Sequence, residues 1–197
     1  DNGRTINYIL QRMNHEIFKN PIELMENIVN VTSFLRKKII SNHGDPDRET
    51  MNIVPTKDGK KYYRDSIGSY WRSYQFIKNA LTLDIVERAE EFYESAFAFG
   101  NFQNLLSDYP AETLHETIPN FHKFLTAVKN DPLGRAASVQ EEIRFVMERE
   151  DFTHTLIRAQ KKGDLPLRVT HNDTKLNNVM LDEKTRKAVC VIDLDTV

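Results

Sequence analysis

This sequence of 197 residues contains little glycine and a single cysteine, and both shortages exclude classes of protein. Cys190 alone cannot form an internal disulfide framework, so a reducing cytoplasm is the simplest setting for the chain. Only 7 residues are glycine, and none forms the GxGxxG pattern of a glycine-rich phosphate loop. Apolar runs are too short to span a membrane, and the first residues lack the pattern of a secretory signal.

The chain also lacks a strong excess of charge of either sign. Its formal net charge is −2, from 27 Lys and Arg against 29 Asp and Glu. This balance argues against a general nucleic-acid partner and against an anionic membrane surface. Hydrophobic residues make up 40% and charged residues 28%, which is typical of a globular domain with a real core.

Polar side chains of chemical interest are concentrated in residues 165–197. Short β-prone runs at Val169–Thr170, Val179–Leu181 and Ala188–Ile192 alternate with polar residues there. A polar loop at residues 182–187 joins the last two runs, as in a β-hairpin. The last run ends directly before Asp193, where a strand end holds a carboxylate rigidly.

The spacing H-x-D-x-K-x-x-N in this segment supplies the groups that phosphoryl transfer from ATP requires. It is formed by His171, Asp173, Lys175 and Asn178, and Asp193 follows the hairpin. Such a transfer needs a carboxylate at the acceptor hydroxyl, a cation near the γ-phosphate and oxygen ligands for Mg²⁺. We expect Asp173 to orient and deprotonate the hydroxyl, mainly by positioning, because an ordinary Asp has a pKa of about 4. Lys175 can reach the transferring phosphate, and Asn178 and Asp193 offer hard oxygens to the metal.

The motif followed by an apolar strand and Asp193 resembles the catalytic and metal-binding loops of protein-kinase-like enzymes. The form HNDTKLNN…VIDLDTV looks most like the aminoglycoside phosphotransferase and choline kinase family. Within that family, the sequence of this segment is similar to that of bacterial N-acetylhexosamine 1-kinases, which phosphorylate the anomeric hydroxyl of N-acetylated hexosamines. The resemblance implies a small-molecule kinase that uses ATP and Mg²⁺, in which His171 braces the loop by hydrogen bonding. For Asp195, a role at the metal and a role behind the metal ligands both remain open.

The resemblance also implies a nucleotide site in the N-terminal part of the chain. Residues 6–13 form a β-prone run, which by resemblance is the strand that carries a phosphate-contacting cation. Arg12 is the candidate for this cation, and of Glu23 and Glu26, which lie off the apolar stripe, Glu26 is the preferred carboxylate to pair with it. The residues alone are explained as well by an exposed strand-end arginine and by an acidic first helical turn that favours the helix dipole.

An aromatic-rich run at residues 70–77 predicts another strand. By resemblance this strand ends at the hinge, where backbone groups of Gln75, Phe76 and Ile77 would meet the nucleotide base. Composition alone would place Trp71 and Phe76 in the core, and for Trp71 the core is the preferred interpretation.

The remaining elements of the N-terminal part are a helix and a hairpin. The run Asn20-Pro21-Ile22-Glu23 starts a helix, with an N-cap asparagine, a proline at the first helical position and an early glutamate. Helical spacing up to Ile40 predicts one apolar face, formed by Leu24, Ile28, Val31, Leu35 and Ile39. The Asp58-Gly59 turn pair predicts a hairpin between two β-prone runs, Ile53–Pro55 and Tyr62–Arg64.

After Asn79 the pattern becomes helical. Thr82 is expected to cap a helix that runs towards Gly100, with a core-facing side formed by Val86, Ala89, Tyr93, Ala96 and Phe97. Another helix is expected after Pro119, and one long or two shorter helices are expected over residues 136–162, before Gly163. The remaining histidines show no metal-ligand spacing and are interpreted as surface or polar-packing residues: His115, His122 and His154.

The order of elements predicts an α+β fold of the bilobal protein-kinase-like plan. Residues 1–77 are expected to form a partial, β-rich N-lobe without its glycine-rich loop. Residues 78–197 are expected to form a partial, mainly helical C-lobe with the catalytic loop and the metal-binding strand. Compared with this bilobal plan, the sequence is expected to be truncated at both ends. The acceptor pocket, the nucleotide preference and the oligomeric state therefore cannot be predicted from it.

Several alternatives remain beside a sugar kinase. The motif residues can be a polar turn and a strand-end cap, and a metal-dependent phosphoesterase is a second interpretation, although such sites usually gather several His and Asp ligands. A choline or aminoglycoside kinase shares the same motif. The missing glycine-rich loop also leaves open an inactive fragment or a non-catalytic nucleotide-binding pseudokinase.

Overall fold

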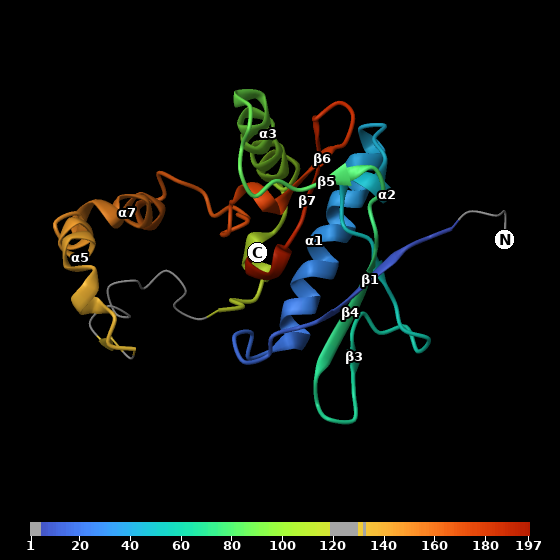
Figure 1. Ribbon diagram of the computed structural model, residues 1–197, viewed down its shortest axis with the longest axis horizontal. Helices are drawn as coiled ribbons and strands as arrows, with labels where there is room; N and C mark the ends of the chain where they lie inside the picture. Colours follow the sequence, from blue (N-terminus) through green and yellow to red (C-terminus); the bar gives the residue numbers. More distant parts are fainter. Residues whose placement is uncertain (1–4, 119–129, 132) are drawn as a thin grey trace. The chain divides into compact units, whose positions relative to one another are not determined.

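The computed structural model describes residues 5–118, 130–131 and 133–197. The chain divides into two compact units, of which one comprises Asp1–Thr117 with Arg168–Val197 and the other Ile118–Leu167. The first unit holds two β-sheets and the long helices, and the second holds short helices (Figure 1). The mixed α+β class predicted from the sequence is confirmed, and it is consistent with a protein-kinase-like fold.

The first sheet is antiparallel and is built around its longest strand, β4. Its strands are β1 (Tyr8–Arg12), β2 (Ile53–Val54), β3 (Tyr63–Arg64) and β4 (Tyr70–Gln75), in the order β1-β4-β2 with β3 also on β4. The predicted hairpin between β2 and β3 is wrong in its pairing, because β4 is long enough to pair with both. A turn still forms between them, where the backbone N–H of Thr56 donates to the carbonyl of Lys60 at 2.8 Å.

The predicted apolar face of helix α1 (Pro21–Ser41) lies in the hydrophobic core that also includes residues of this sheet. The side chain of Asn20 caps it by accepting a hydrogen bond from the backbone N–H of Glu23 at 3.4 Å. The five predicted core residues are buried, and they share one apolar core with residues that include Met13, Met51 and Tyr74. The helix start and its buried face are therefore as predicted.

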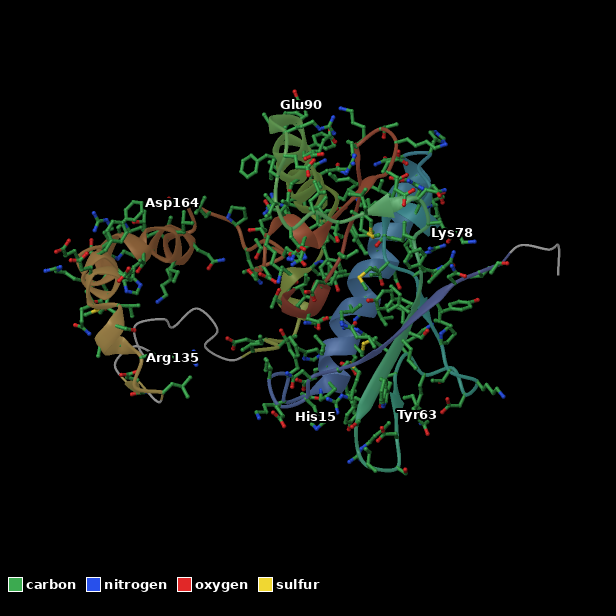
Figure 2. The ribbon with its side chains drawn as sticks, viewed as in Figure 1. His15, Tyr63, Lys78, Glu90, Arg135 and Asp164 are labelled. Carbon is green, nitrogen blue, oxygen red and sulfur yellow. The ribbon has the colours of Figure 1, made fainter. Side chains whose placement is uncertain are left out.

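The second sheet is antiparallel, in the order β5 (Ala80–Leu81), β6 (Val179–Asp182) and β7 (Ala188–Val191). The predicted hairpin of β6 and β7 is confirmed, whereas Val169 and Thr170 lie outside any strand. Lys78, which Figure 2 labels, begins the short connector from the first sheet to the second. The predicted lobe boundary after Ile77 falls at this connector, inside the first compact unit, and stays a prediction.

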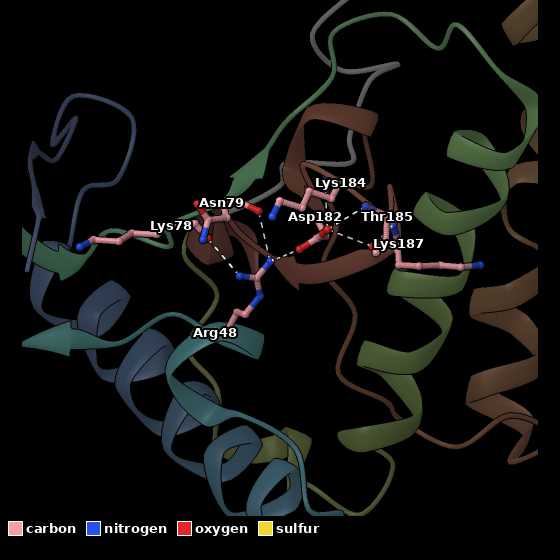
Figure 3. A network of polar contacts seen from close by, with 7 residues as sticks. All are labelled: Arg48, Lys78, Asn79, Asp182, Lys184, Thr185 and Lys187. Carbon is pink, nitrogen blue, oxygen red and sulfur yellow. Dashed lines mark hydrogen bonds and ion pairs between the residues drawn. The ribbon is translucent and has the colours of Figure 1, made fainter.

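A short helix, α2 (Pro46–Glu49), contributes Arg48 to a polar network at this connector. Figure 3 shows the guanidinium of Arg48 between the connector and the turn of the β6–β7 hairpin. Its Nη1 donates to the carbonyl of Lys78 at 3.1 Å, and its Nη2 donates to the carbonyl of Asn79 at 3.2 Å and to Oδ2 of Asp182 at 2.5 Å. One side chain thus joins α2, the connector and β6.

Helix α3 (Ala89–Leu105) corrects two predictions, because it begins well after Thr82 and buries a different face. Its buried side consists of Glu91, Glu94, Ser95, Ala98 and Phe102, whereas Tyr93 and Phe97 are 65% and 56% exposed. Both buried carboxylates are paired: Glu91 with Arg88, and Glu94 with Lys187 of the hairpin. The two glutamates can lie on the buried face because each carboxylate has a cationic partner.

The second unit contains a 3₁₀ turn, η2 (Ala136–Ser138), followed by three short helices, α5 (Gln140–Met147), α6 (Glu150–Thr153) and α7 (Thr155–Lys162). The chain thus breaks more often here than the one or two predicted helices imply. Gly163 ends α7 at a φ of 83°, as predicted, because glycine adopts this left-handed conformation without strain. The helix predicted after Pro119, and His122 within it, lie outside the described residues. Within the described ranges, no helix has the length and apolar character needed to cross a bilayer.

Candidate active site

His171 joins the loop after Val169 to the end of β7. Its side chain is fully buried, with ring edges against Phe99 and Phe102. Nε2 lies 2.8 Å from the carbonyl oxygen of Ile192, and Nδ1 accepts a hydrogen bond from the backbone N–H of Asp173 at 3.3 Å. Since a carbonyl only accepts and an N–H only donates, these contacts assign Nε2 as the donor and Nδ1 as the acceptor. The geometry agrees with a bracing role for His171.

Asp173 lies at the centre of the motif and is held on one of its two oxygens. Its Oδ2 accepts from Nζ of Lys175 at 2.7 Å and from Nδ2 of Asn178 at 3.1 Å. The bond from Lys175, followed by that from Asn178, lowers the pKa of Asp173 against the opposing effect of burial. No hydrogen bond from the described residues reaches Oδ1 of Asp173, which leaves this oxygen for an acceptor hydroxyl.

Asn178 and Asp193 are positioned by the two strands of the hairpin. Asn178 ends the 3₁₀ turn η3 (Leu176–Asn178), and its carbonyl accepts from the backbone N–H of Ile192 at 2.9 Å. Its Nδ2 donates to the carbonyl oxygen and to Oδ2 of Asp173, so its Oδ1 is left for a cation. Asp193 follows β7 at a left-handed φ of 61°.

The donor set fits Mg²⁺, whose ligands are hard oxygens. Burial raises the pKa of Asp193, and the neighbouring carboxylate of Asp195 raises it further. A divalent cation at this position would therefore offset the free-energy cost of keeping Asp193 ionised. No cluster of three or more His, Cys, Asp or Glu suited to a metal occurs in the part of the chain that the structure describes. In kinase-type sites Mg²⁺ is usually held by one or two protein groups, water and substrate phosphates.

Asn178 and Asp193 line a cavity of about 230 Å³ that extends to the first sheet. The predicted hinge residues Gln75, Phe76 and Ile77 line the same cavity. Its other lining residues are Ile9, Gln11, Met51, Arg72, Tyr74, Met180 and Ile192. The structure therefore brings the candidate base-binding and metal-binding residues to one cavity between the two sheets, with Asp173 hydrogen-bonded to its lining residue Asn178.

Arg12 and Glu26 do not reach this cavity. Gln11 is the neighbouring residue of β1 that lines it, and the alternation of a strand turns Arg12 to the opposite face, where it is exposed. Oε2 of Glu26 lies 2.9 Å from Nε2 of His115, and both side chains are substantially exposed. Among the described residues, the expected Arg12–Glu26 ion pair is not formed, and Glu26 pairs with His115 instead.

A buried ion pair that sequence reasoning missed lies in the wall of the cavity. The guanidinium of Arg72 donates from Nη1 and Nη2 to the two carboxylate oxygens of Asp195, at 2.5 and 3.1 Å. The side chains are 2% and 15% exposed, respectively. The pair fixes the chain just after Asp193 against β4. Since 123 positions separate the two residues, no local pattern indicates their contact.

Comparison with known families finds a match for the C-terminal part of the chain. The model of the family APH, described as "Phosphotransferase enzyme family", matches residues 86–197. The match spans α3, the second unit, the catalytic loop and the β6–β7 hairpin. It includes Asp173, Lys175, Asn178 and Asp193, whereas the first sheet and α1 precede it.

Proposed function

The chain belongs to the APH phosphotransferase enzyme family, and from this premise we propose that it is an ATP- and Mg²⁺-dependent kinase of a small-molecule hydroxyl group. The acceptor is a sugar such as an N-acetylhexosamine, phosphorylated at its anomeric hydroxyl. The observation that carries the proposal is the arrangement around Asp173. Its Oδ2 is fixed by Lys175 and Asn178 while its Oδ1 is left for the acceptor.

Each group then has one role in the transfer. Asp173 orients the acceptor hydroxyl through Oδ1 and takes up its proton. Lys175, whose side chain is half exposed, offsets negative charge on the transferring phosphate. Oδ1 of Asn178 and the carboxylate of Asp193 would hold Mg²⁺, which supplies charge neutralisation on the phosphates when bound.

The nucleotide base is assigned to the far end of the same cavity. Gln75, Phe76 and Ile77 line it where β4 ends, and the connector that follows them is tied down by Arg48. Backbone groups at a strand end are suited to a planar heteroaromatic ring, because they offer a fixed donor and acceptor pair. The sugar acceptor rests on the similarity of the segment HNDTKLNN…VIDLDTV to N-acetylhexosamine 1-kinases.

The test is ADP release with Mg²⁺ against N-acetylglucosamine, N-acetylgalactosamine, choline and an aminoglycoside, with ³¹P NMR of the product. A 1-phosphate of an N-acetylhexosamine is the expected result. Turnover of choline or the aminoglycoside alone would refute the sugar acceptor and keep the phosphotransfer. ATP binding without turnover of any acceptor would favour a non-catalytic nucleotide-binding protein over the kinase.

Asp173→Asn is the sharpest variant, because it keeps the shape of the side chain and removes its capacity to take a proton. We expect turnover to fall by about 10³-fold or more while the Kd for ATP changes less than about threefold. The matched control is Asp164→Asn, at an exposed position outside the motif, which should leave both quantities unchanged. Loss of ATP binding together with turnover in Asp173→Asn would contradict the assigned role.

A further inference from the structure

The wall of the cavity formed by the first sheet carries its cation on β4 and not on β1. The residues of β1 that line the cavity are Ile9 and Gln11, and neither is charged. Arg72, opposite Gln11 in the β1–β4 register, is the one lining residue with a positive charge among those described. A triphosphate with one bound Mg²⁺ keeps a net negative charge, so a nucleotide in this cavity needs donors from this wall.

Hydrogen bonding fixes the orientation of the Gln11 amide. Its Oε1 accepts from Nε of Arg72 at 2.9 Å and from the hydroxyl of Tyr74 at 3.5 Å. An oxygen that receives two donors identifies the other amide atom as the nitrogen. No acceptor among the described residues takes up the N–H groups of this nitrogen, so Gln11 has two N–H donors left for a ligand.

Arg72 also has donors left after its protein contacts. A guanidinium has five N–H groups, and Arg72 uses one on Nε for Gln11 and one on each Nη for Asp195. One N–H on each Nη therefore has no partner among the described residues. Because Asp195 already balances its charge, Arg72 is held rigidly and at low desolvation cost beside the cavity.

We propose that Gln11 and Arg72 together form the subsite for the phosphate chain of the nucleotide, with Asp195 as the positioning residue that holds Arg72. This inference rests on the proposed function. Three walls of one cavity then have separate tasks: hinge backbone for the base, Asn178 and Asp193 for Mg²⁺, and the Gln11–Arg72 donor pair for phosphate oxygens. The expected Arg12–Glu26 pair has no part in it, and a buried pair between β4 and the segment after Asp193 takes its place.

Two variants with the same change of net charge, at adjacent positions of β1, test the subsite. Gln11→Glu keeps the side-chain shape and the contact with Arg72 but directs a carboxylate at the phosphates. Arg12→Gln also lowers the net charge by one, on the opposite face of the strand. The measurement is the Kd of ATP, ADP and adenosine by isothermal titration calorimetry with Mg²⁺ present. We expect Gln11→Glu to raise the Kd for ATP by about tenfold or more and the Kd for adenosine by less than about twofold.

Arg12→Gln should leave the affinities for all three ligands within about twofold of the wild type. Arg72→Lys is a third variant: it keeps the charge, loses the bidentate fork, and should lower the affinity ratio of ATP to adenosine by several-fold. An unchanged ratio in Gln11→Glu and Arg72→Lys, with wild-type protein that binds ATP, would overturn the subsite and leave the kinase proposal intact. Wild-type protein that binds no ATP would overturn both proposals.

Discussion

Nε2 of His171 lies 2.8 Å from the carbonyl oxygen of Ile192, so one buried imidazole connects the catalytic loop to the residue before Asp193. Its Nδ1 holds the backbone N–H of Asp173 at 3.3 Å. Asp173 and Asp193 are thus positioned by a single side chain that does not itself line the cavity. Under the proposed function His171 is a positioning residue, which is the bracing role that the resemblance implied.

We predict that His171→Ala lowers the free energy of unfolding by about 3 kcal/mol, since it leaves a cavity and two backbone groups without partners. Its kcat should fall more than its KM for ATP rises, because the reacting groups move while the hinge stays in place. Urea unfolding and steady-state kinetics check both. His154→Ala, at an exposed position, is the control and should stay within about 0.5 kcal/mol of the wild type. An unchanged kcat in folded His171→Ala would contradict the bracing role.

The ion pair of Glu94 and Lys187 predicts a pH-dependent part of the stability. Glu94 is 6% exposed on α3 and accepts from Nζ of Lys187 at 2.7 Å and from the backbone N–H of Ala188 at 2.9 Å. The bond from Lys187 and that from Ala188 hold the pKa of Glu94 below its ordinary value. This stabilisation is present above the unfolded pKa of about 4.3 and is lost as the pH falls through the lower folded pKa.

Glu94→Gln should therefore be less stable than the wild type by about 1 to 2 kcal/mol at pH 7, and the difference should shrink towards pH 3. Urea midpoints measured from pH 7 to pH 3 give the comparison. Asp58→Asn is the control, because Asp58 and its partner Lys60 are both more than half exposed. If the difference in stability between Glu94→Gln and the wild type stayed constant from pH 7 to pH 3, the charge of Glu94 would not contribute to the stability of the fold.

Local patterns predicted those elements whose causes lie within the element. The start of α1 follows from Asn20 and Pro21, and its buried face follows from apolar residues at helical spacing. The β6–β7 hairpin and the contacts within H-x-D-x-K-x-x-N likewise depend on neighbours in sequence. For these, tertiary packing only completes what short-range geometry already favours.

Predictions failed where a distant partner decides the outcome. Glu94 lies on the buried face of α3, where it pairs with Lys187, 93 positions further along the chain. The hydrophobic periodicity of the helix does not indicate this partner. At the proposed nucleotide site, Arg12 differs from the cavity-lining Gln11 by one position, and one step along a strand reverses the face. The Arg72–Asp195 pair joins β4 to the 3₁₀ turn η4 (Leu194–Thr196) after β7, and this contact forms only when the two segments are folded together.

Arg48 offers a prediction about nucleotide binding from outside the cavity. It joins the carbonyls of Lys78 and Asn79 to the carboxylate of Asp182, and these carbonyls follow directly after the hinge residue Ile77 (Figure 3). Arg48→Met keeps much of the side chain's length and removes every donor. We expect the free energy of unfolding to fall by about 1 to 3 kcal/mol, because two carbonyls and a partly buried carboxylate lose a shared partner.

The loosened connector should also raise the KM for ATP by about threefold or more while kcat changes less. The reason is that Arg48 supports the proposed base-binding backbone and, among the described residues, makes no hydrogen bond with the loop around Asp173. Arg48→Lys should be intermediate, since an ammonium group lacks the planar fork that reaches both carbonyls. Arg144→Met, which removes an arginine 67% exposed in its side chain, is the control for lost charge. If Arg48→Met lost stability as expected and yet kept the wild-type KM for ATP, that result would contradict the link between the connector and nucleotide binding. The role of Arg48 would then be restricted to holding the two sheets together.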